Sequence, residues 1–134
     1  MHLSFLVNNL DQARKFYVDV LGCNEGRSAA TWIDFDMHGN QLSVHFCKDW
    51  KGAQGTGIVD DKNVPMPHFG AVLPLYVWEA LSKKLIDADI QFILDPQIRF
   101  KGQPGEQATM FIFDPSGNAL EFKGFKEMEN IFST

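Results

Sequence analysis

Two segments of this chain align with each other, but only one of them carries a carboxylate in the column that follows the shared residues. Residues 36–46 read DMHGNQLSVHF and residues 114–122 read DPSGNALEF, so Asp, Gly, Asn and Leu fall in the same columns of both. In the next column the first segment has Ser43 and the second has Glu121. A repeated turn and strand indicates that the chain contains two related modules.

A histidine stands at the head of each module: His2 begins the first and His68 begins the second. If the modules are related by a pseudo-two-fold axis, His2, His68 and Glu121 face one cavity, with Ser43 at the fourth corner. Two imidazoles and one carboxylate suit a divalent transition metal, and a neutral Ser43 would leave an open position for water or substrate. His45 faces the same side of its strand as Ser43, so it is a candidate acid, base or substitute ligand.

The first module, residues 1–47, is expected to contain a strand, a helix and several further strands. Apolar residues recur with helical spacing between Asp11 and Gly22, which could cap the two ends of that helix. Alternating segments predict strands over residues 2–7, 31–37 and 41–46.

The second module, residues 68–125, repeats this order. We expect a strand over residues 68–75, a helix over 77–88, and strands over 91–95, 108–114 and 118–122. Residues 48–67 are expected to form the loop that joins the modules, and residues 96–107 a second long loop. Both segments are rich in Gly and Pro, and loops of this length often act as lids over a site.

Composition narrows the class of protein. The hydrophobic fraction of 45%, the charged fraction of 22% and the length of 134 residues fit one globular domain. A net charge of -5 argues against nucleic acid or an anionic membrane as the main partner, because both require a basic surface. Cys23 and Cys47 form neither a metal-binding pair nor a disulfide framework, and the sequence contains no signal peptide or membrane span, so we expect a cytoplasmic protein.

The doubled unit resembles the vicinal oxygen chelate superfamily, which includes glyoxalases, extradiol dioxygenases and fosfomycin- and bleomycin-resistance proteins. The resemblance rests on HLSFLV and LDQARKFYVDVLG in the first module, PHFG at the start of the second and DPSGNALEF near the end, and it covers nearly the whole chain. It implies an α+β fold in which a βαβββ module is used twice, each forming half of a cupped mixed sheet around a metal. Residues 1–134 would then form a single domain of this superfamily.

The resemblance also implies a ligand set, because the ligand columns of the family fall on His2, His68 and Glu121, with Ser43 in the remaining column. Typical glyoxalases have Glu or Gln at the position of Ser43, and that carboxylate helps to move the substrate proton. A site with two His and one Glu is instead similar to the iron or manganese extradiol dioxygenases and to the manganese thiol transferases that open fosfomycin. We therefore expect Fe(II) or Mn(II), with Zn(II) or Ni(II) as alternatives.

The favoured hypothesis is a metal-dependent enzyme, similar to a dioxygenase, that acts on a small substrate with vicinal oxygens. The alternatives are a glyoxalase-like lyase or isomerase, a fosfomycin-type thiol transferase, and a bleomycin-resistance-like protein that binds a small molecule without converting it. No Arg closely follows Glu121, which weakens the transferase alternative. The substrate pocket is expected to include Ser4, Arg99, Phe100, Phe111 and Phe113. We also expect a homodimer, because the modules leave sheet edges that a partner often covers.

Overall fold

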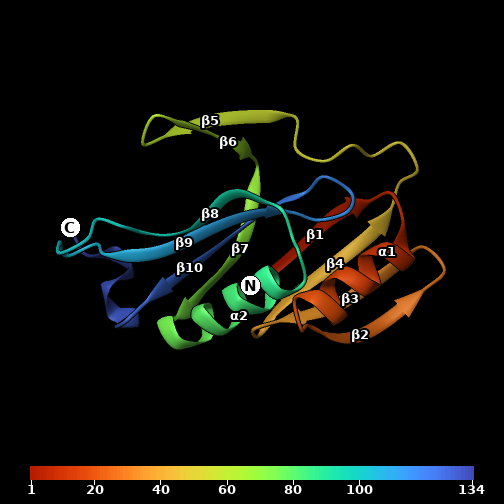
Figure 1. The fold of residues 1–134 in the computed structure, drawn as a ribbon. Coiled ribbons are helices and arrows are strands. Elements are labelled where there is room, and N and C mark those ends of the chain that lie inside the picture. The colour runs from red at the N-terminus through yellow and green to blue at the C-terminus, as the bar shows by residue number, and fades with distance from the viewer. The chain divides into compact units, whose positions relative to one another are not determined.

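A computed structural model describes all 134 residues, which group into two compact units. The first unit contains residues 1–67 and 114–119, and the second contains residues 68–113 and 120–134. Each unit contains a four-stranded sheet and one main helical segment (Figure 1).

The first unit contains the first βαβββ module and an additional hairpin. Its elements are β1 (His2–Val7), α1 (Leu10–Arg14) with a π-helical continuation (Lys15–Val20), β2 (Asn24–Ala29), β3 (Trp32–Met37), β4 (Asn40–Phe46), β5 (Gly55–Val59) and β6 (Lys62–Met66). The sheet has the order β1-β4-β3-β2, in which β1 is parallel to β4 and the other pairs are antiparallel. It is therefore a mixed sheet.

The second unit repeats this arrangement. Its elements are β7 (His68–Pro74), α2 (Leu75–Asp87), β8 (Phe92–Arg99), β9 (Gln107–Phe113), β10 (Ala119–Phe125) and a short 3-10 helix (Met128–Phe132). The strand order β7-β10-β9-β8 is the counterpart of β1-β4-β3-β2. The expected α+β fold with two βαβββ modules is confirmed.

The structure differs from the expectation at several boundaries. The first helix begins at Leu10, because the side chain of Asn9 rather than Asp11 accepts the capping hydrogen bond from the backbone N–H of Gln12. The segment over residues 48–67, expected to be a loop, contains the β5–β6 hairpin. The second long loop is shorter than expected, since β8 continues to Arg99.

The sheet of the first unit has one apolar and one polar face. Leu3, Phe5, Ile33, Phe35, Met37, Leu42 and Val44 form the apolar face, and the helical segment packs against β3 and β4 there. Tyr17 stacks on Phe35 with 5.1 Å between ring centroids. The opposite face presents His2, Ser4, Trp32, Asp34, Asp36, Gln41, Ser43 and His45 from three neighbouring strands. Strand alternation thus assigns the apolar residues to the core and leaves the polar face for chemistry.

The turn over residues 114–118 is organised by the buried carboxylate of Asp114. Its oxygens accept hydrogen bonds from the Tyr17 hydroxyl at 2.9 Å, the backbone N–H groups of Ser116 and Asn118 at 2.9 Å each, and the Asn118 amide at 2.8 Å. The amide of Asn118 also donates to the Leu6 carbonyl, which ties the turn to β1. Burial nevertheless raises the pKa of Asp114, because the donors only partly offset the loss of water.

The matching turns of the two modules have different lengths. In the first module His38 and Gly39 both have positive φ and connect Met37 to its partner Asn40, as in a two-residue hairpin turn. In the second module the backbone N–H of Gly117 donates to the Asp114 carbonyl, as in a β-turn, and the backbone N–H of Asp114 donates to the Asn118 carbonyl. The aligned residues are therefore shared, but the turns that they form differ in length.

Two strands of the second sheet approach closely where β7 passes β10. A Cβ atom added to Gly70 would overlap the carbonyl oxygen of Glu121. Glycine at this position therefore lets the backbones of β7 and β10 come together next to two expected site residues, His68 and Glu121.

No helix in the structure is long and apolar enough to cross a membrane. The longer helix, α2, has 13 residues, and Trp78, Leu81 and Leu85 on it are buried. The indole N–H of Trp78 donates to the Phe122 carbonyl, so α2 is fixed to β10 by packing and by a hydrogen bond.

Replacing Tyr17 with Phe should lower the free energy of unfolding by about 1–3 kcal/mol, because a buried carboxylate oxygen of Asp114 loses a donor. Since the pKa of Asp114 is raised, its contribution to stability is greatest below the ordinary carboxylate pKa and is lost as the pH rises through the folded pKa. The Tyr17 hydroxyl opposes the rise in the pKa of Asp114. The variant should therefore lose more unfolding free energy at pH 7 than at about pH 3.9. Urea unfolding at the two pH values measures this difference.

Tyr76→Phe is the matched control, because Tyr76 is the other tyrosine and is 76% exposed. Its unfolding free energy should stay within about 0.5 kcal/mol of the wild type. Equal losses in the two variants would contradict the assigned role of the Tyr17 hydroxyl.

Replacing Gly70 with Ala should destabilise the protein by about 1–3 kcal/mol, because the added methyl group forces β7 and β10 apart. Gly26→Ala is the control, since a Cβ there would lie 3.5 Å from its nearest neighbour, which is an ordinary contact. Urea unfolding of the two variants tests the close approach. A Gly70→Ala protein as stable as the control would show that the strands can separate without cost.

Candidate functional site

The polar face of the first unit contains a hydrogen-bonded group around His2. Its Nδ1 atom lies 3.0 Å from Oε1 of Gln41, its partner in the β1–β4 pairing. Its Nε2 atom lies 3.1 Å from the hydroxyl oxygen of Ser4. Both ring nitrogens of His2 are therefore engaged, although the residue lies at an exposed strand end.

Next to this group, Ser43 and Asp34 form a short hydrogen bond. The Ser43 hydroxyl donates to Oδ1 of Asp34 at 2.5 Å, while the other oxygen, Oδ2, accepts from the Gln41 amide at 3.3 Å and from Arg27 at 3.5 Å. Chiefly because of the Ser43 hydrogen bond, and against the effect of burial, the pKa of Asp34 is lowered. Asp34 is thus a buried carboxylate that stays ionised at neutral pH.

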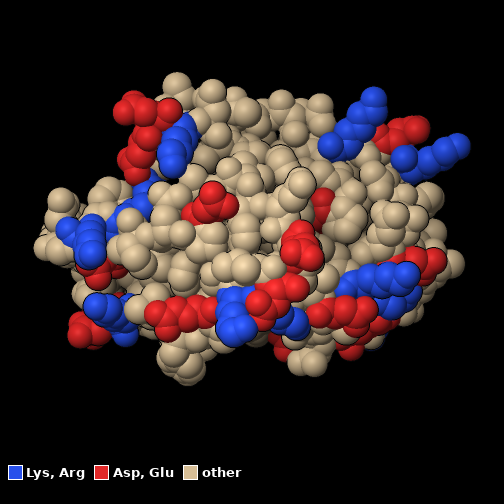
Figure 2. Space-filling model, viewed as in Figure 1, with Lys and Arg blue, Asp and Glu red and all other residues tan.

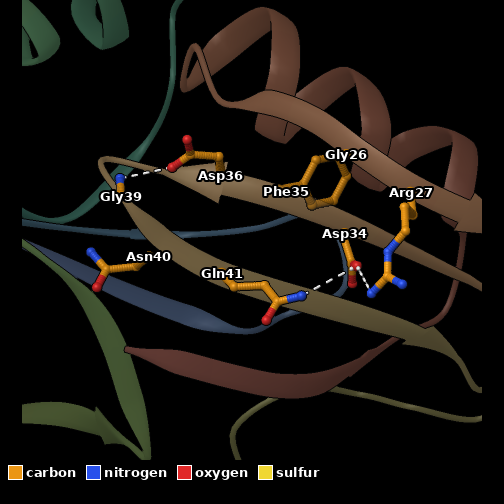
Figure 3. A pocket seen from close by; sticks show the side chains of 8 residues that line it. All are labelled: Gly26, Arg27, Asp34, Phe35, Asp36, Gly39, Asn40 and Gln41. Atoms are coloured by element: carbon orange, nitrogen blue, oxygen red, sulfur yellow. Dashed lines mark hydrogen bonds and ion pairs between the residues drawn. The ribbon is translucent and has the colours of Figure 1, made fainter.

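A hollow of about 350 Å³ opens on this part of the first unit. Its lining includes Arg27, Asp34, Asp36, Asn40 and Gln41, and Figure 3 shows Gln41 and Arg27 converging on Asp34. Asp36 turns away to accept a hydrogen bond of 2.7 Å from the backbone N–H of Gly39. Of the two carboxylates that line the hollow, that of Asp36 accepts a hydrogen bond from the turn, and that of Asp34 accepts hydrogen bonds from side chains on the polar face.

The second unit brings two of the predicted ligands together. Nε2 of His68 and Oε2 of Glu121 are 3.3 Å apart, and the Glu121 side chain is 10% exposed. The other oxygen, Oε1, accepts a hydrogen bond of 2.8 Å from the hydroxyl of the fully buried Thr109. Lys123 is 4.0 Å from the same oxygen, a distance at which a partly exposed pair adds little. Thr109 thus fixes one oxygen of Glu121 and turns the other toward His68.

The geometry of this pair fits a bound cation. Two ligand atoms at about 2.0–2.2 Å from one ion, with an angle of about 90–109° between them, lie about 2.8–3.6 Å apart. The separation of Nε2 of His68 and Oε2 of Glu121 falls in that range. Imidazole nitrogen and carboxylate oxygen are also the donors that divalent iron, manganese, nickel and zinc accept.

His2 belongs to the first unit, whereas His68 and Glu121 belong to the second. Within neither unit do three or more His, Cys, Asp or Glu side chains gather in a metal-binding arrangement. The set of three ligands therefore stays a prediction.

The other predicted site residues lie in different surroundings. Phe111 is buried and its ring meets His68 edge-to-face, with 4.8 Å between centroids. Phe100 and Phe113 are exposed, and Arg99 lies over the Phe100 ring at 5.0 Å. His45 is exposed on the polar face of the first sheet, where it pairs with Trp32.

Three residues of these groups were missed from the sequence: Asp34, Gln41 and Thr109. Asp34 and Thr109 each place a polar group in a strand that is otherwise largely apolar, and both are buried. A buried polar residue inside an apolar strand is the signal that could have identified them. Their partners could not have been identified, because the cross-strand register is not visible in the sequence.

Charged side chains on the face shown in Figure 2 are interspersed, with acidic and basic groups lying together along the lower edge of the view. No broad area of one sign stands out on that face. A site there would depend on individual polar side chains rather than on a field of like charges.

Comparison with known proteins identifies the family. A model of the Glyoxalase/Bleomycin resistance protein/Dioxygenase superfamily matches residues 1–122. A solved structure of a glyoxalase/bleomycin resistance protein/dioxygenase from Alicyclobacillus acidocaldarius is 32% identical, with a TM-score of 0.80, and the match covers 98% of this chain and 95% of that one.

More distant structures share the fold. The fosfomycin resistance protein FosX from Listeria monocytogenes is 11% identical, with a TM-score of 0.70 and coverage of 97% and 94% of the two chains. A glyoxalase/dioxygenase from Nostoc punctiforme is 15% identical, with a TM-score of 0.70 and coverage of 94% and 90%. No curated protein matches the sequence significantly. On the family model and the 32% identical structure, this chain belongs to the Glyoxalase/Bleomycin resistance protein/Dioxygenase superfamily.

Proposed function

We propose that this protein is a metal-dependent enzyme that acts on a small substrate with vicinal oxygen atoms, with chemistry most similar to that of a dioxygenase. The observation that carries the proposal is the His68–Glu121 pair, whose facing atoms lie 3.3 Å apart while Thr109 holds the second carboxylate oxygen. A carboxylate oriented by a buried hydroxyl is the kind of support that metal ligands receive in proteins.

In this proposal His2, His68 and Glu121 hold Fe(II) or Mn(II), with Zn(II) or Ni(II) as alternatives. A divalent cation would stabilise the negative charge that develops on the substrate oxygens. Protein side chains would transfer the proton and orient the substrate. His45, whose imidazole is exposed, would take or deliver a proton.

Ser43 would act through its oxygen lone pairs. Its hydroxyl hydrogen is already donated to Asp34, so toward a substrate or water it can serve as an acceptor only. Ser4 has a similar position beside His2, to which its hydroxyl is hydrogen-bonded. These two hydroxyls would orient polar groups of the substrate without adding charge.

Aromatic residues would form the apolar part of the pocket. The Phe111 ring packs against the His68 ring in a T-shaped contact. Phe113 and Phe100 are exposed and would contact an apolar substrate, and Arg99, which lies over the Phe100 ring, would supply a cation for an acidic group.

The alternatives within the superfamily are a glyoxalase-like lyase or isomerase and a fosfomycin-type thiol transferase. The alternative of another class is a small-molecule binding protein similar to those of bleomycin resistance. These readings differ in substrate and in the need for a metal, so one set of measurements separates them.

Protein purified without chelator and reconstituted without oxygen should bind about one Fe(II) or Mn(II) per chain, as measured by elemental analysis. His68→Ala and Glu121→Gln should each lose the metal and turnover, because each removes a ligand atom of the facing pair. The substrate panel is a catechol with oxygen monitoring, a methylglyoxal–thiol adduct and fosfomycin with a thiol. His45→Ala should keep the metal and lose most of its turnover.

His38→Asn is the matched control, because it removes an imidazole from an exposed turn where φ is 52° and Asn tolerates that conformation. Turnover of the adduct or of fosfomycin would assign one of the enzyme alternatives. Retained stoichiometric metal in His68→Ala would refute the ligand assignment. Stoichiometric binding of an aromatic ligand by metal-free protein, without conversion, would favour the binding protein.

We also propose that the protein is a cytoplasmic homodimer. In the first unit the edge strand β2 is exposed along its whole length, and an exposed edge is a surface that a second copy can cover. Light scattering at micromolar concentration should give twice the mass of the 15.2 kDa chain. A monomeric mass at that concentration would contradict the dimer.

A further inference from the structure

A chain of hydrogen bonds connects the carboxylate of Asp34 to the imidazole of His2 through the amide of Gln41. Nε2 of Gln41 donates to Oδ2 of Asp34 at 3.3 Å, and Oε1 of Gln41 lies 3.0 Å from Nδ1 of His2. The three residues come from β3, β4 and β1, which are neighbours in the sheet of the first unit. Figure 3 shows the Asp34 end of this chain.

The chemistry of these groups permits only one direction of donation. An ionised carboxylate can only accept hydrogen bonds, so Gln41 must present its NH2 group to Asp34 and its carbonyl oxygen to His2. An amide oxygen can also only accept, so Nδ1 of a neutral His2 must carry the proton. The other ring nitrogen, Nε2, then has a lone pair, which accepts the hydrogen bond from the Ser4 hydroxyl.

We propose that Asp34 and Gln41 are positioning residues that hold neutral His2 as the Nδ1–H tautomer and so make Nε2 its metal-binding atom. This inference rests on the proposed function for the metal, but not for the tautomer. The Ser4 hydroxyl donates to the lone pair of Nε2, and it would release that lone pair to a cation.

Asp34, at one end of this series of hydrogen bonds, is held firmly enough to enforce the direction of donation. Asp34 is 7% exposed and accepts hydrogen bonds from Ser43 and Arg27 as well as from Gln41. These donors lower the pKa of its carboxyl group, the Ser43 hydroxyl most of all, so it remains an acceptor at neutral pH. The contribution of Arg27 is limited, because its side chain is 81% exposed.

The positioning has a consequence for metal affinity. A histidine that binds a metal through one ring nitrogen commonly donates the other N–H to a fixed acceptor, and loss of that acceptor costs about 10–100-fold in affinity. Gln41 is that acceptor for His2, and Asp34 fixes its orientation. The polar face of the first unit therefore prepares one ligand before any metal arrives.

The tautomer can be read directly by 15N NMR of the metal-free protein. The spectrum is recorded at a pH about two units above the ordinary histidine pKa of about 6.5, so that the imidazole is neutral. The chain has four histidines, and the spectrum of His2→Gln identifies the signals of His2. We expect a protonated Nδ1 and an unprotonated Nε2.

Asp34→Asn should reverse the direction of donation along the hydrogen bonds from residue 34 to His2. The new side-chain oxygen can still accept from Ser43, but its amide donates toward Gln41, which must then turn its own NH2 group toward Nδ1 of His2. The proton of His2 moves to Nε2, and Zn(II) affinity, measured by competition with a chromophoric chelator, should fall about 10–100-fold. Gln41→Met, at an exposed position, should abolish the preference for either tautomer.

Asp36→Asn is the control: Asp36 is opposite Gln41 on the same strand as Asp34, so the variant removes the same charge, but the carboxylate of Asp36 accepts its hydrogen bond from the backbone N–H of Gly39. It should leave the tautomer and the Zn(II) affinity unchanged. A proton on Nε2 of wild-type His2, or an unchanged tautomer in both Asp34→Asn and Gln41→Met, would overturn the inference. Wild-type protein with the expected tautomer that binds none of the divalent metals would uphold the positioning and refute the proposed metal site.

Discussion

The candidate site depends most on the hydrogen bonds that the buried carboxylate of Asp114 accepts. Its four hydrogen bonds fix the turn at residues 114–118, and β10 begins directly after that turn. Because side chains alternate along a strand, the starting point of β10 decides the face on which Glu121 lies. A shift of one residue would turn Glu121 away from Thr109 and His68. The carboxylate that organises the turn thus determines the orientation of a proposed ligand.

Each module has a hydroxyl–carboxylate hydrogen bond between two neighbouring strands of its sheet, but the two modules exchange its partners. In the first module the hydroxyl is Ser43 on β4 and the carboxylate is Asp34 on β3. In the second the carboxylate is Glu121 on β10 and the hydroxyl is Thr109 on β9. The first module has therefore not lost its carboxylate; it carries one on the neighbouring strand. There Asp34 supports other side chains through Gln41, whereas Oε2 of Glu121 faces His68.

The sequence predicted the two helices and most of the strands, because helical spacing is followed by strand alternation in each module. It missed β2, whose residues Asn24–Ala29 are all exposed and show no alternation of buried and exposed positions. It could not predict β5 and β6, since Gly, Pro and Asp in residues 48–67 resemble a loop and the hairpin is held by backbone pairing. Nor could it predict the partners of His2. Asp34, Gln41 and His2 meet only through two registers, that of β3 with β4 and that of β4 with β1. The first follows from a two-residue turn that the aligned segment of the second module does not share.

The serine at position 43 also has an electrostatic consequence for the proposed reaction. With His2, His68 and Glu121 as ligands, a divalent cation would keep one net positive charge, whereas a second carboxylate in place of Ser43 would neutralise it. A positively charged centre favours substrates that bind as anions through adjacent oxygens, because each oxygen then gains charge stabilisation. Asp34 does not cancel this preference as a ligand, since its oxygens are taken by Ser43, Gln41 and Arg27. Under the proposed function, a hydroxyl rather than a carboxylate at position 43 would favour the chemistry of a catecholate or enolate over proton transfer between two carboxylate ligands.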